Sequence, residues 1–167
     1  VVLHKYKDIQ KEQLCNSIVM HDELSEVLGY PKDGIFEYVF DDIVKLTGHS
    51  CPTAASTYIM IKVGLEILYV NVIPERGHIR ISIKGKQSEG VNGVIGSIAT
   101  YISGASGEEG FNGINGKFGR KNRITFNPNQ KHTIVITCDD NKRKVGINLL
   151  MHKVPSNPLI NEYLQLI

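Results

Sequence analysis

The residue types best suited to chemistry gather in one short stretch, Gly48-His49-Ser50-Cys51-Pro52. Proline is favoured at the first position of a helix, because its missing N–H would be unpaired there in any case. Pro52 therefore predicts a helix start, with Cys51 at or next to the N-cap, where free backbone N–H groups favour a negative charge. A thiolate in that position can act as a nucleophile or as a metal ligand.

His49 and Cys51 stand two residues apart, and the residue before a proline is pushed toward extended geometry. Side chains two apart in an extended segment point to the same side, so the imidazole and the thiolate can reach one ion. This pair suits zinc better than magnesium or calcium, although a zinc site usually takes three or four ligands. The structural alternative is that the cysteine is a small buried hydrophobe and the histidine a hydrogen-bonded core residue.

The stretch resembles the His-Gly-His-x-Cys-Pro-Gly signature of the FmdE-like family of formylmethanofuran dehydrogenase, in which the signature follows a short helix and opens a long one. This chain has Thr47 in place of the first histidine and Thr53 in place of the last glycine. The resemblance covers residues 35–150 in element order and is specific only at residues 48–52. It implies a long helix packed on a small mixed sheet, with His49 and Cys51 as metal ligands and zinc as the expected ion.

A second motif of the family, Cys-x-x-Asp followed after six residues by Gly-Cys-Thr, aligns with residues 94–106. Val94 and Ala105 stand at the two cysteine positions and Ser97 at the aspartate, so both later cysteines are absent here. A glycine-rich loop then spans residues 104–123. The resemblance implies that this loop lies near the metal, where it could close over the site.

Length and composition indicate one domain over residues 1–167, with an N-terminal helical extension over 1–34 and a C-terminal helix over 156–167. A net charge of +2 is too weak to predict nucleic acid or an anionic membrane as a partner. No apolar run reaches the length of a membrane span. Three widely spaced cysteines and the lack of a signal-peptide pattern favour the cytoplasm, with a removed leader still compatible. Base rates favour a homodimer.

Apolar periodicity predicts an element order typical of an α+β fold. We expect helices over residues 5–28, 36–46, 52–70 and 94–103, and strands over 78–84, 123–126, 132–138 and 144–150. The helix from Pro52 to Val70 is apolar on nearly every side, so we expect it to be buried at the centre of the fold. Helices would then cover one face of a mixed, mostly antiparallel sheet of about four strands.

Four functions are compatible with these observations. The first is a metal-binding domain that holds zinc through His49 and Cys51, with the other positions filled by water, a small-molecule ligand or a residue from elsewhere. The second is a thiol enzyme with Cys51 as nucleophile and His49 as base. The third is a carrier of haem or another cofactor, because a Cys-Pro pair with a nearby histidine can hold haem iron. The fourth is an interaction module without a cofactor.

Overall fold

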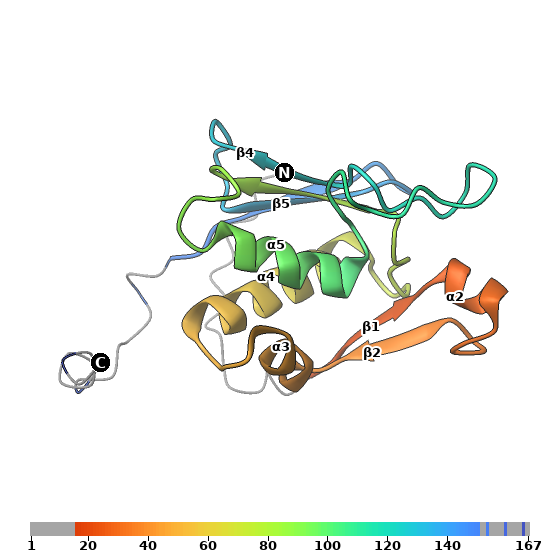
Figure 1. The fold of residues 1–167 in the computed structure, drawn as a ribbon, viewed down its shortest axis with the longest axis horizontal. Coiled ribbons are helices and arrows are strands. Elements are labelled where there is room, and N and C mark those ends of the chain that lie inside the picture. The colour runs from red at the N-terminus through yellow and green to blue at the C-terminus, as the bar shows by residue number, and fades with distance from the viewer. Residues whose placement is uncertain (1–15, 151–152, 154–158, 160–164, 166–167) are drawn as a thin grey trace.

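The structure, a computed structural model, describes residues 16–150 and the single positions 153, 159 and 165. Figure 1 shows a layer of helices beneath a sheet, with a separate pair of strands beside the helices. The described elements are, in order, β1 (Ile18–His21), α2 (Glu23–Leu28), β2 (Ile35–Tyr38), α3 (Phe40–Thr47), α4 (Pro52–Leu68), β3 (Ile79–Lys84), α5 (Asn92–Ser103), β4 (Ile124–Asn127), β5 (Ile134–Cys138) and β6 (Lys144–Ile147).

The larger sheet has four strands in the order β4-β3-β5-β6. Strand β3 runs parallel to β4 and antiparallel to β5, and β5 runs antiparallel to β6. Along β3 the buried residues Ile79, Ile81 and Ile83 alternate with polar ones, because successive side chains of a strand point to opposite faces. The predicted α+β class and the small mixed sheet are confirmed.

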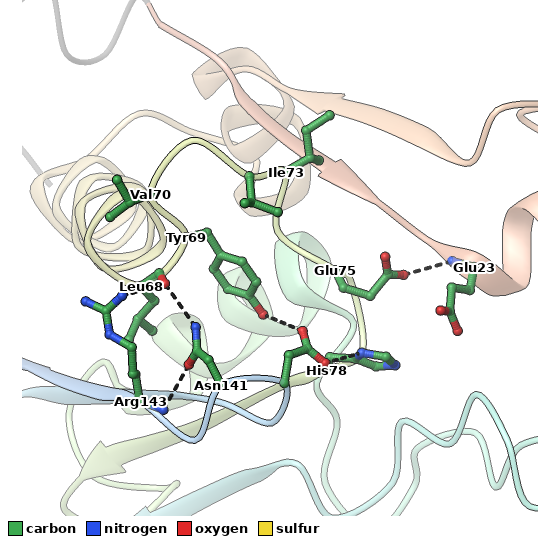
Figure 2. A pocket seen from close by; sticks show the side chains of 11 residues that line it. Glu23, Leu68, Tyr69, Val70, Ile73, Glu75, His78, Asn141 and Arg143 are labelled. Carbon is green, nitrogen blue, oxygen red and sulfur yellow. Dashed lines mark hydrogen bonds and ion pairs between the residues drawn. The ribbon is translucent and has the colours of Figure 1, made fainter.

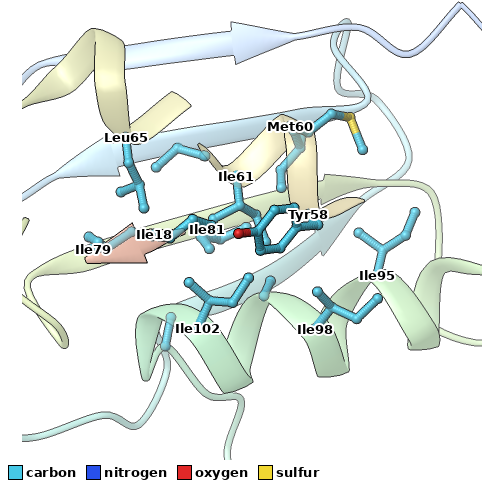
Figure 3. Close-up of a cluster of buried hydrophobic side chains, with 14 of the residues drawn as sticks. Ile18, Tyr58, Met60, Ile61, Leu65, Ile79, Ile81, Ile95, Ile98 and Ile102 are labelled. Carbon is cyan, nitrogen blue, oxygen red and sulfur yellow. The ribbon is translucent and has the colours of Figure 1, made fainter. Parts of the chain in front are cut away.

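Helices α4 and α5 pack against each other and against this sheet, α4 on β5 and β6 and α5 on β3. Ten of the seventeen residues of α4 are buried, and the helix begins at Pro52 as its sequence predicts. A glycine allows the close approach, since a Cβ added at Gly64 would crowd the side chains of Ile136 and Ile147. Figure 3 shows the shared core, which includes Tyr58, Ile61, Leu65, Ile79, Ile81, Ile98 and Ile102.

The helix predicted over residues 5–28 is wrong for most of the part that the structure describes. Residues 18–21 form β1, which pairs antiparallel with β2. Ile18 and Met20 are buried on either side of an exposed valine, a period of two rather than of 3.6. Asp22 then accepts hydrogen bonds from two N–H groups of the next turn, so a helix starts only at Glu23.

One further helix boundary differs from the prediction, and two predicted segments lie largely outside the described residues. The helix predicted from residue 36 begins at Phe40, because residues 35–38 are paired with β1. The C-terminal helix predicted over 156–167 lies outside the described residues apart from positions 159 and 165, as do residues 1–15 of the N-terminal extension. Among the described helices, none is both long enough and apolar enough to cross a membrane.

Candidate functional site

Cys51 is the N-cap of α4. Its backbone is extended (φ −144°, ψ 167°), and its Sγ accepts a hydrogen bond from the N–H of Ala54 at 3.5 Å. Pro52 occupies the first turn, as predicted. The half-buried sulfur therefore lies at the end of α4 where unpaired N–H groups and the positive end of the helix dipole favour a negative charge.

His49 is exposed on the loop that joins α3 to α4, and its ring orientation is fixed by the backbone. The Nδ1 atom lies 2.9 Å from the carbonyl oxygen of Thr47. Since a carbonyl oxygen only accepts, Nδ1 carries the hydrogen in this arrangement, and Nε2 keeps its lone pair in the neutral ring. Ligating histidines commonly donate their other ring N–H to a carbonyl or a carboxylate in this way.

The loop itself is held by Gly48 and Thr47. Gly48 ends α3 in the left-handed region (φ 77°), a conformation that costs glycine little. The Thr47 hydroxyl lies 2.9 Å from the carbonyl oxygen of Ile43 and 2.8 Å from that of His49, and it can donate its one hydrogen to either. Thr47 thus stabilises the loop from within.

The described residues offer His49 and Cys51 no third protein ligand. Within residues 16–150, no cluster of three or more histidine, cysteine, aspartate or glutamate side chains is placed to hold a metal ion. Residues 94–106, which resemble the second motif, also supply no good metal ligand. The side chains of Val94 and Ala105 are hydrocarbons, and the Ser97 hydroxyl donates to a carbonyl of its own helix.

The glycine-rich loop of residues 104–123 does not close over Cys51, contrary to expectation. Figure 1 shows this loop at the end of the helix layer where α5 terminates, whereas α4 begins at the opposite end. The loop is fixed there because Arg120 donates a hydrogen bond to the carboxylate of Asp22 at 2.7 Å and another to the backbone oxygen of Arg76.

Asp22, Arg76 and Arg120 form a buried ionic cluster that joins three distant segments. The Asp22 side chain is 3% exposed, and its two oxygens accept from Arg120 at 2.7 Å and from Arg76 at 2.9 Å. Burial by itself would raise the pKa of Asp22, but the two guanidinium groups and the N–H of Ser25 lower it below its ordinary value. Arg76 also donates to the last carbonyls of α5, those of Tyr101 and Ile102.

A cavity of about 470 Å³ opens beside the last turn of α4 (Figure 2). Its walls come from the end of α4, from the connection to β3, from the start of α2 and from the β5–β6 turn. The lining residues are Glu23, Leu68, Tyr69, Val70, Val72, Ile73, Glu75, His78, Asp140, Asn141 and Arg143. Neither His49 nor Cys51 contributes to it.

A chain of hydrogen bonds runs along one wall of this cavity. The buried thiol of Cys138 donates to the hydroxyl oxygen of Tyr69 at 3.0 Å, and that hydroxyl lies 3.3 Å from Oδ2 of Asp140. The other carboxylate oxygen lies 2.7 Å from Nδ1 of His78. Burial, followed by the contacts with Cys138 and Asp140, raises the pKa of Tyr69, so the phenol stays neutral.

Sequence reasoning misses this cluster. Cys138 is buried at the end of β5, Asp140 lies in the β5–β6 turn and His78 precedes β3, so no local pattern relates the three. The signal that unites them is strand pairing: Ile79 and Cys138 are register partners on β3 and β5. That register brings the residues just outside the two strand ends together, and it is not readable from either strand alone.

Comparisons with models of protein families, with curated proteins and with solved structures find no match to this chain. The resemblance to the FmdE-like family therefore stays a prediction made from residues 48–52. Two places in the structure carry side chains suited to chemistry: the start of α4, with His49 and Cys51, and the cavity beside its end.

Proposed function

We propose that the chain is a metal-binding domain and that His49 and Cys51 are its ligands, with zinc as the ion. The observation that carries the proposal is the hydrogen bond from the His49 ring to the carbonyl of Thr47. It commits Nδ1 as the donor and leaves Nε2 for an ion, which is the arrangement that a ligating imidazole needs. The sulfur of Cys51 lies at the start of α4, where it accepts a hydrogen bond from the N–H of Ala54.

In this proposal His49 and Cys51 would fill two positions of a zinc site and leave the others open. Zinc is bound by thiolate sulfur and imidazole nitrogen, usually within a set of four ligands. Because the described residues supply two, we expect water or a small molecule at the other positions, or donors from a second chain. A zinc ion with open positions acts as a Lewis acid toward the molecule it binds.

The alternative of a thiol enzyme is less well supported. A cysteine nucleophile requires its base within hydrogen-bonding reach. Among the described residues, however, the Cys51 sulfur is bonded to the N–H of Ala54 and the His49 ring to the carbonyl of Thr47, and no hydrogen bond joins the pair. A metal can bridge two such side chains without any bond between them.

The haem alternative is also less well supported. Haem needs a large apolar cavity around its axial ligand. The cavity of about 470 Å³ lies at the far end of α4 and is lined by neither Cys51 nor His49. The start of α4 offers an exposed histidine and a half-buried cysteine, which suit a small ion better than a macrocycle.

Zinc content measured on purified protein tests the proposal. We expect stoichiometric zinc in the wild type and its loss in Cys51→Ser and His49→Gln. The matched controls Cys138→Ala and His78→Gln remove the same residue types elsewhere, one from the buried core and one from the cavity lining, and should keep the metal. A ratio of one zinc per two chains would assign the open positions to a second copy. Zinc that persists in both site variants, or is absent from a folded wild type after incubation with zinc, would overturn the proposal.

A further inference from the structure

Part of the cavity beside the end of α4 is lined by apolar side chains that remain exposed to solvent. Val70, Val72 and Ile73 are 61%, 65% and 49% exposed. Next to them stands Tyr69, whose hydroxyl is already satisfied by Cys138 and Asp140 and whose ring, partly buried against the core, lines the cavity. Figure 2 shows the Tyr69 side chain between Val70 and Ile73. Such a surface suits the hydrocarbon part of a small molecule.

Three carboxylates also line the cavity. Asp140 lies beside the Tyr69 hydroxyl. Glu75 accepts from the His21 ring at 2.6 Å and from the backbone N–H of Glu23 at 2.9 Å, and Glu23 is the third. Figure 2 shows Glu75 next to Glu23. The Glu23 carboxylate makes no hydrogen bond or ion pair with any described residue. It therefore remains available to a ligand.

Arg143 is the arginine that lines the cavity, and its guanidinium binds the end of α4. Arg143 donates to the carbonyl oxygens of Ile67 and Leu68, the unpaired carbonyls at the C-terminus of α4. A cation in that position offsets the negative end of the helix dipole. Counting only aspartate, glutamate, lysine and arginine, the three carboxylates and this single guanidinium give the lining a formal charge of −2, although the whole chain carries +2 on the same count.

We propose that this cavity binds an organic ammonium ion with a compact apolar body. The apolar wall would cover the hydrocarbon part, the carboxylates of Glu23 and Asp140 would accept from the ammonium group, and the Tyr69 ring would supply a cation–π contact. The cavity volume of about 470 Å³ lies in the range that holds small-molecule ligands. The site is independent of the proposed metal ligands, since the length of α4, roughly 25 Å for its seventeen residues, separates them.

Three probes of matched hydrocarbon length separate the contributions of charge and burial. Binding of n-hexylammonium, n-hexanol and hexanoate is followed by amide chemical shifts in ¹H–¹⁵N spectra of the full chain. We expect n-hexylammonium to saturate at about 1–10 mM and to shift residues 68–75 and 140–143, n-hexanol to bind more weakly and hexanoate not to bind. Equal binding of hexanoate, or the absence of a saturable site, would overturn the proposal.

Two conservative variants test whether the carboxylates of Glu23 and Asp140 bind the ammonium group. Glu23→Gln and Asp140→Asn should each weaken n-hexylammonium about threefold or more, whereas Glu108→Gln, an exposed acid of the glycine-rich loop, should leave it unchanged. Unchanged binding in both cavity variants, with native spectra, would contradict the assignment. A lysine side chain also carries an ammonium group on a hydrocarbon chain. Tighter binding of N-acetyl-lysinamide than of n-hexylammonium would overturn the proposal of a free amine and identify the ligand as a lysine of a peptide.

Discussion

Removing the carboxylate of Asp22 should destabilise the fold far more than removing an exposed one. Asp22 caps α2, and substitution of a capping side chain by alanine costs about 1 kcal/mol. Its loss also leaves the guanidinium of Arg120, 10% exposed, buried without its partner. Breaking a buried ion pair by removing one partner costs about 3–5 kcal/mol. Taking the lower end of both costs, we expect Asp22→Ala to lower the free energy of unfolding by at least about 4 kcal/mol.

Urea denaturation monitored by circular dichroism measures this change. For a domain of this size, about 4 kcal/mol corresponds to a fall in Tm of roughly 8–16 °C. Asp22→Asn keeps a capping oxygen and removes only the charge, so its loss should be smaller. Asp41→Ala removes an exposed carboxylate and should stay within about 0.5 kcal/mol of the wild type. A loss below about 1 kcal/mol in Asp22→Ala would refute the view that this cluster holds the three segments together.

The pH dependence gives the same prediction an independent check. The pKa of Asp22 is lowered in the folded state, so the unfolded chain binds its proton first as the pH falls. The contribution of Asp22 is therefore complete above the unfolded pKa of about 3.9, and it is lost as the pH falls through the folded value. The difference in unfolding free energy between wild type and Asp22→Asn should be constant from pH 5 to 7 and shrink below pH 4.

Two further predictions concern the backbone beside the cluster and the thiols. Gly77→Ala should destabilise by more than about 1 kcal/mol in urea denaturation, because Gly77 has φ 90° and an added Cβ would collide with the Arg120 guanidinium; wild-type stability would contradict this. In a Cys15→Ser background, Cys51 should react with a disulfide reagent at least a hundredfold faster than the fully buried Cys138 in native protein, and equal rates would contradict the difference in burial between the two thiols.

Local patterns predicted the elements that carry a strong period. The alternation from His78 to Lys84 identified β3, and the apolar run after Pro52 identified α4 with its first residue. The capping position of Cys51 followed from the proline alone. These features depend on residues that are close together in the sequence, so they can be predicted from it.

Other features depend on partners far along the chain. Residues 18–21 became a strand because β2 pairs with them, although their apolar spacing also fits a helix. The ion pair of Asp22 with Arg120 spans 98 positions, and no local pattern relates the two residues. The cavity likewise requires the end of α4 and the β5–β6 turn to meet, which only the assembled sheet determines.

The most direct test of the central claim is the X-ray absorption fine structure at the zinc edge, recorded on protein loaded with one equivalent of zinc. The account predicts a first shell with a sulfur near 2.3 Å, from Cys51, and an imidazole nitrogen near 2.0–2.1 Å, from His49, together with further light atoms. Cys51→Ser should remove the sulfur, and Cys138→Ala should keep it. A shell of oxygen and nitrogen alone in the wild type would contradict the assignment of Cys51 as a ligand.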